Sequence, residues 1–169
     1  FTKKYLENLN LVNYSKFFEK TYKGNINRVK WAASNNVFLK YSAIKKHKLF
    51  FDKALNRFGI GEDQLFFLKL NSYGHKIYWS KNVKVFENIH EHRMNLKWLI
   101  NRSFRLGVLG HYIDTNIHGK PIGFTISYLK CIYYFIKASG CILLFFNNKF
   151  QTQLLNYLSR FYGRLIGPI

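Results

Sequence analysis

Acidic side chains are scarce in this 169-residue chain, which holds 8 Asp and Glu against 27 Lys and Arg and carries a net charge of +19. Such an excess of cations predicts an anionic partner, which is nucleic acid, an anionic membrane surface or a phosphorylated substrate. The charge does not choose among the three. Aromatic residues make up 19% of the chain, which is typical of globular or membrane-associated proteins and not of disordered ones.

Cysteine is also scarce. Cys131 and Cys141 stand ten positions apart in an apolar stretch, with no CxxC spacing and no paired histidines nearby. This pattern excludes a disulfide framework and a zinc site, and indicates small buried side chains in a reducing compartment. The sequence opens on Phe1 without an initiator Met or a signal-peptide pattern, so we expect it to be a piece of a longer protein.

Hydrophobic periodicity predicts both helices and strands. Helices are expected over residues 1–23, 38–48, 64–72 and, after Glu87, along the stretch NIHEHRMNLKWLINRSFRLG. Short strands are expected over 26–34, 75–79 and 83–87. The order strand, helix, strand predicts a mixed α/β layer over about one domain.

Two adjacent carboxylates, Glu62 and Asp63, follow a loop with two glycines and precede an apolar run in FGIGEDQLFFLKL. They therefore lie where a loop enters a helix, and a helix N-terminus favours negative charge. One interpretation is a helix start signal. The other is a catalytic pair, because acids are rare in this chain. Upstream, Asn35 and Asn36 follow small residues and suit either a turn or the approach of a polar ligand.

The segment HGKPIG, residues 118–123, marks a boundary, and the 51 residues from Gly119 contain six Lys or Arg and no acid. The apolar run 122–146 is long enough to span a bilayer, but each of Lys130 and Lys137 at mid-bilayer would cost about 2.5 to 3.5 kcal/mol. Their spacing of seven places both on one helix face. A basic amphipathic helix in the membrane interface is therefore favoured over a spanning helix or a soluble packing helix. A second amphipathic helix is expected over 151–169.

A carboxylate pair followed by an arginine-rich helix suits transfer from a diphosphate-activated donor. This reaction needs a base for the attacking hydroxyl and cations for the leaving phosphate. Glu62 or Asp63 is the candidate base, and the candidate phosphate or acceptor contacts are Arg93, Arg102 and Arg105. Trp98 precedes Arg102 by four residues, so its indole can pack beside the guanidinium. The alternative for these arginines is a solvated or lipid-facing basic surface.

In their order, the motifs between Trp31 and Gly107 resemble the C-terminal half of a family 2 glycosyltransferase, a large inverting group with the GT-A fold. The matching features are Asn35-Asn36, the later basic pair Lys45-Lys46, Phe51-Asp52 with Lys53 in place of an acid, Gly61-Glu62-Asp63, Gly74, Glu87 with Arg93, and Trp98, Arg102, Arg105 and Gly107. The resemblance covers under half of the chain.

This resemblance implies an α/β fold, with a partial GT-A-like acceptor-side half over 1–118 and a helical, membrane-associated tail over 119–169. It implies that Asp63, beside Glu62, deprotonates an acceptor hydroxyl while sugar passes from a nucleotide-sugar to a lipid-linked or polysaccharide acceptor. The expected substrate-binding residues are Asn35, Asn36, Arg93, Trp98, Arg102 and Arg105. The expected location is the cytoplasmic face of a bacterial inner membrane, peripheral or integral through residues 122–169.

The resemblance also implies a divalent cation, Mg²⁺ or Mn²⁺, in the full enzyme. The Asp-x-Asp ligands are absent, because the only aspartates here are Asp52, Asp63 and Asp114. We therefore expect this chain to be inactive alone. His90 and His92 lack a third ligand nearby, so they are interpreted as a polar loop and no metal site is assigned.

The alternative function is a basic nucleic-acid-binding module without catalytic activity, which would use the +19 charge and the aromatic side chains. No RNP, zinc or helix-turn-helix signature supports it, and the basic residues are spread along the whole chain. Nucleic acid is therefore the less favoured partner.

Overall fold

A computed structural model describes residues 25–85, 90–142 and 148–167 of the chain, with the side chains of 148 and 149 left out. The predicted helix over 1–23 lies outside these residues, as do the last two positions of the predicted strand over 83–87. The chain forms two compact units. We call residues 22–87 the small unit, and residues 88–169 together with 1–21 the helical unit.

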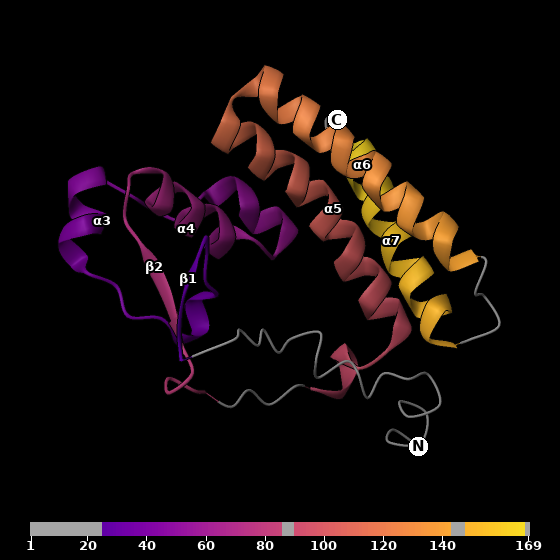
Figure 1. Cartoon of the computed structure of the whole chain (residues 1–169), viewed down its shortest axis with the longest axis horizontal. Helices are drawn as coiled ribbons and strands as arrows, with labels where there is room; N and C mark the ends of the chain where they lie inside the picture. The colour runs from indigo at the N-terminus through magenta and orange to yellow at the C-terminus, as the bar shows by residue number, and fades with distance from the viewer. Residues whose placement is uncertain (1–24, 86–89, 143–147, 168–169) are drawn as a thin grey trace. The chain divides into compact units, whose positions relative to one another are not determined.

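The small unit contains short helices and one two-stranded sheet (Figure 1). Its elements are β1 (Ile26–Val29), the 3-10 turn η2 (Ser34–Asn36), α3 (Tyr41–His47), the 3-10 helix η3 (Lys53–Phe58), α4 (Glu62–Ser72) and β2 (Ile77–Ser80). The strands are antiparallel, with Ile26 opposite Ser80 and Val29 opposite Ile77. Gly74, with φ +87°, follows α4 and confirms the predicted left-handed glycine at the end of this helix.

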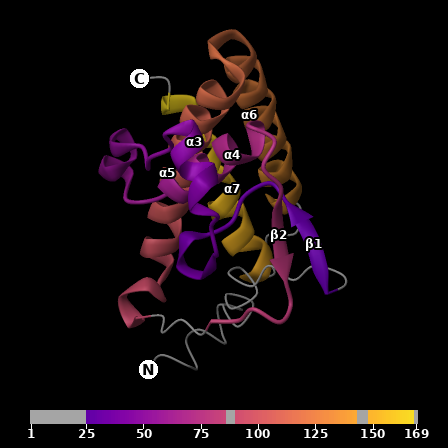
Figure 2. The ribbon, with the colours of Figure 1, turned by 90° about the vertical axis from the view of Figure 1, so that its left-hand side faces the viewer.

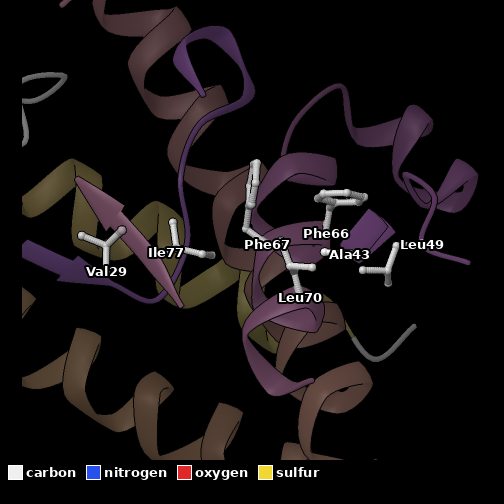
Figure 3. Packing of buried hydrophobic residues seen from close by; sticks show 7 residues of the cluster. All are labelled: Val29, Ala43, Leu49, Phe66, Phe67, Leu70 and Ile77. Carbon is white, nitrogen blue, oxygen red and sulfur yellow. The ribbon is translucent and has the colours of Figure 1, made fainter. Parts of the chain in front are cut away.

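Helix α4 contributes more residues to the core of the small unit than any other element (Figure 3). Its buried side chains are Val29, Ala43, Leu49, Phe66, Phe67, Leu70 and Ile77. Phe67 is fully buried and its ring meets that of Phe66 edge-on, with centroids 5.2 Å apart. Because α4 provides three of these seven residues, its packing also fixes the position of its first turn, where Glu62 and Asp63 lie.

The helical unit packs three long helices against one another (Figures 1 and 2). A short turn η4 (Glu91–Arg93) precedes α5 (Leu96–His118), α6 (Lys120–Ile142) and α7 (Asn148–Ile166). Gly119, with φ +79°, separates α5 from α6, and Pro121 stands in the first turn of α6, where a missing N–H is tolerated. The boundary predicted at 118–123 is thus the break between two helices of one unit.

Close backbone contact joins α5 to α7. A Cβ atom added at Gly107 would lie 2.9 Å from the Cα of Gly163, and one added at Gly163 would lie 3.0 Å from the Cα of Gly107. Real Cβ atoms essentially never approach other atoms closer than 3.0 Å. Both positions therefore require glycine at this helix crossing.

The predicted fold class is wrong. The described residues are mostly helical, and their only strands are β1 and β2, which pair antiparallel with each other. This is not an α/β GT-A-like domain. The short apolar runs that predicted a larger sheet have other roles, since Trp31 and Ala32 continue past β1 as irregular chain packed on the core, and Val83 to Val85 are exposed and form no strand.

The helical character of residues 119–169 is confirmed for α6 and α7. Across the described parts of the chain, no helix combines the length and the apolar character needed to cross a lipid bilayer.

Candidate functional site

Asp63 lies in the first turn of α4, where the sequence predicts a helix start. Gly61 is the N-cap residue and has φ +93°, a conformation that glycine adopts without a steric penalty. Glu62 and Asp63 follow as the first two helical residues, and both are half-buried. The backbone N–H of Gln64 donates a 2.7 Å hydrogen bond to Asp63 Oδ1. The helix-start interpretation of the pair is confirmed, and it leaves a catalytic role open.

The turn η2 contacts this carboxylate, although it lies far from α4 in the sequence. The backbone N–H of Ser34 donates to Asp63 Oδ2 at 3.3 Å, across 29 positions of sequence. Asn35 and Asn36 follow Ser34 in the same turn, and the Asn36 side chain donates to the carbonyl of Val83 at 3.3 Å. The structure therefore brings the Asn35-Asn36 segment next to the Glu62-Asp63 pair.

The chemistry of Asp63 follows from these two contacts. Each carboxylate oxygen accepts one backbone hydrogen bond, whereas an ionised carboxylate offers about four acceptor positions. Both oxygens thus retain capacity to accept a hydrogen bond from a ligand hydroxyl. By contrast, Asp52 is the N-cap of η3, where its Oδ1 accepts from the N–H of Ala54 at 3.0 Å, which indicates a structural role.

The predicted arginine-rich helix is the first half of α5. Asn95 caps it by accepting from the N–H of Trp98 at 2.8 Å. The Arg102 guanidinium carbon lies 5.1 Å from the centre of the Trp98 ring, which confirms the predicted packing of indole beside guanidinium. Arg105 follows three residues later, and Arg93 ends η4. Arg93, Arg102 and Arg105 are half-buried, so they do not form a fully solvated basic face.

The predicted site residues therefore form two groups, one in each unit. Asn35, Asn36, Glu62 and Asp63 belong to the small unit. Arg93, Trp98, Arg102 and Arg105 belong to the helical unit. A site that combines both groups stays a prediction.

Sequence reasoning missed a buried ionic cluster between the three long helices. Asp114 of α5 binds Arg164 Nη1 of α7 at 2.8 Å and Lys130 Nζ of α6 at 2.7 Å. Arg164 Nη1 also donates a hydrogen bond to Ser127 Oγ at 3.0 Å. The sequence predicts Lys130 and Lys137 on one basic helix face, but the ammonium group of Lys130 pairs with Asp114 of α5, while the Lys130 side chain stays 44% exposed. The available signal was that Asp114 is the last acid in the chain, with six Lys or Arg after it.

A histidine pair in the small unit was also missed. His47 Nε2 and His75 Nε2 lie 3.0 Å apart, and the His47 ring stacks on Tyr73 with centroids 4.3 Å apart. A hydrogen bond between two imidazole rings requires one nitrogen without a proton. Burial, the neighbouring His75 and Lys46 all lower the pKa of His47 from 6.5, so the neutral ring is favoured.

The described residues do not fit the cation that the resemblance implies. Within residues 25–85, 90–142 and 148–167, no cluster of three or more His, Cys, Asp or Glu side chains could hold a metal ion. The rings of His90 and His92 stack on each other with centroids 5.6 Å apart. No reaction step is therefore assigned to a metal held by these residues.

Comparison of the chain with protein families, curated proteins and solved structures finds no match.

Proposed function

We propose that this chain provides the acceptor-side part of an inverting glycosyltransferase, with Asp63 as the general base. The observation that carries the proposal is the hydrogen bond from the Ser34 N–H to Asp63 Oδ2. It joins the two segments that a sugar transferase of this kind would use at its acceptor, the Ser-Asn-Asn turn and the Gly-Glu-Asp helix start, although 29 positions separate them.

The proposed step is a single displacement. The acceptor hydroxyl oxygen forms a bond to the anomeric carbon of a nucleotide-sugar while the bond from that carbon to the diphosphate oxygen breaks. The hydroxyl proton passes to Asp63, and attack opposite the leaving group inverts the anomeric configuration. Glu62, Asn35 and Asn36 line the acceptor side in this proposal.

Negative charge grows on the departing diphosphate, and fixed cations lower the energy of that transition state. Arg93, Arg102 and Arg105 are proposed for this task or for contact with a lipid-linked or glycan acceptor. Their half-buried positions support the proposal, because a cation partly withdrawn from water interacts more strongly with an anion. Trp98 restricts the orientation of Arg102 by packing against its guanidinium.

The proposal assigns donor binding to a part outside this sequence, because the sequence contains no Asp-x-Asp and the described residues do not fit a cation. We expect no sugar transfer by residues 1–169 alone. Mg²⁺ or Mn²⁺, if used, would be bound by that other part.

The test supplies the chain with a donor-binding part, in the same or a separate polypeptide, and adds a panel of nucleotide-sugars with lipid-linked and glycan acceptors. The expected product has the inverted anomeric configuration by NMR, and nucleoside diphosphate is released in equal amount. A product with retained configuration would contradict the proposal. So would absence of turnover together with salt-sensitive retardation of RNA or DNA, which would favour the nucleic-acid-binding module.

A further inference from the structure

Helix α6 presents an unusual number of large apolar side chains to solvent. Nine of them are between 41% and 66% exposed, namely Ile122, Phe124, Tyr128, Leu129, Ile132, Tyr133, Phe135, Ile136 and Ile142. At 3.6 residues per turn these positions fall on one half of the helix surface. We call this set the outer face of α6. Its extent exceeds the scattered exposed apolar residues that are normal on a protein surface.

The opposite half of α6 is occupied by protein. Gly123, Ser127, Cys131, Ala138 and Cys141 are buried where α6 packs on α5 and α7. A Cβ atom added at Gly123 would lie 2.7 Å from the backbone nitrogen of Thr115 in α5, so the two helices touch. Figures 1 and 2 show α6 running alongside α5 and α7 over most of its length. The packing thus fixes which half of α6 points outward.

We propose that the outer face of α6 docks on an anionic lipid surface, with the helix lying in the plane of the membrane interface. Branched aliphatic and Phe side chains would enter the acyl boundary. Tyr128 and Tyr133 would sit at the headgroup level, where an aromatic ring with a polar tip is favoured. An interfacial helix of this kind needs one apolar half and one polar or protein-covered half, and α6 has both.

The positive charge of the chain indicates that the partner of the outer face of α6 is an anionic lipid surface. The sequence of α6 and α7 contains no acid, and Lys137 stands exposed at the margin of the outer face with its Nζ 5.8 Å from the Tyr133 ring. A long lysine side chain at such a margin can extend to lipid phosphates. A second copy of this chain would bring the same +19 charge to the interface, whereas an anionic bilayer brings the opposite charge. This inference does not depend on sugar transfer.

The test is co-sedimentation of the full chain with vesicles of phosphatidylcholine alone and of an equal mixture of phosphatidylcholine and phosphatidylglycerol. We expect binding to the mixed vesicles that weakens in high salt. Ile132→Asp with Ile136→Asp should reduce the partition coefficient by at least about tenfold for each side chain withdrawn from lipid. The matched control is Phe38→Asp with Phe50→Asp, which makes the same change at exposed apolar residues of the small unit and should bind as the parent does.

Circular dichroism and thermal unfolding of both double variants establish that each remains folded. If the α6 variant unfolds, Ile136→Gln alone replaces it, with the same direction of effect expected. Equal loss of binding in both pairs, or equal binding to both kinds of vesicle, would overturn the proposal. It would also be overturned if the chain binds no vesicles but forms dimers in analytical ultracentrifugation that the α6 substitutions abolish.

Discussion

At the scale of single residues, Asp114 is the group on which the buried charges of the helical unit depend. Replacing it by Ala would leave Arg164 buried without its carboxylate partner, and such removals cost about 3 to 5 kcal/mol. Lys130→Ala is the matched control, because the Lys130 side chain is 44% exposed and its pair with Asp114 is worth at most about 1 kcal/mol. Urea unfolding followed by circular dichroism measures both. Similar losses for the two variants would contradict this account of the cluster.

His47 makes a second prediction at the residue scale, concerning pH. Its pKa is lowered in the folded chain relative to 6.5, so folding favours the neutral ring. The stability that His47 contributes is therefore fully present above about pH 6.5 and is lost as the pH falls toward the lowered pKa. Burial, and then the neighbouring His75 and Lys46, make protonation of His47 unfavourable, while Tyr73 stacks on the ring.

Thermal unfolding measured from about pH 8 to about pH 5 checks this prediction. His47→Gln should flatten the fall in melting temperature on the acid side, whereas the same change at the exposed His118 should leave the profile as it is. The interpretation of the histidine pair would fail if His47→Gln had no effect on the shape of the profile.

At the scale of elements, the crossing of α5 and α7 depends on glycine. Gly107→Ala should destabilise the chain by about 1 to 3 kcal/mol, because its Cβ atom would meet the backbone of α7. Gly140→Ala in α6 is the control, since nothing lies within 4 Å of a Cβ atom there, and Ala is favoured in helices by about 1 kcal/mol. In chemical denaturation, Gly107→Ala should thus lower the free energy of unfolding, whereas Gly140→Ala should raise it. Stabilisation by both would contradict the close crossing.

Local signals in the sequence predicted several elements correctly. The two glycines and two acids before an apolar run predicted the start of α4, and Gly74 predicted its end. These features depend on residues that are neighbours in the sequence, so the sequence alone predicts them. Contacts between elements that are distant in the sequence were not predicted. No local pattern indicated the contact of Ser34 with Asp63 or the ion pair of Lys130 with Asp114.

At the scale of the whole molecule, the fold class was wrong for a related reason. Short runs such as Ile26–Val29 and Ile77–Ser80 have strand character, but whether they join a large sheet depends on partners elsewhere. In the described residues they have only each other, and long helices dominate. The net charge of +19, by contrast, follows from the sequence alone. It supports the proposed anionic lipid partner, because α6 and α7 contain no acidic residue.

The central claim is that Asp63 removes the proton from an acceptor hydroxyl, and the most direct test is the rate of sugar transfer by Asp63→Asn. This variant keeps one acceptor oxygen, which can serve the N–H of Ser34 or that of Gln64 but not both, and it cannot take up the proton at neutral pH. We expect kcat to fall by about 10² to 10⁴ when the chain is assayed together with a donor-binding part. Asp52→Asn, which preserves the cap of η3, should transfer sugar at close to the parent rate. Near-parent transfer by Asp63→Asn would contradict the account.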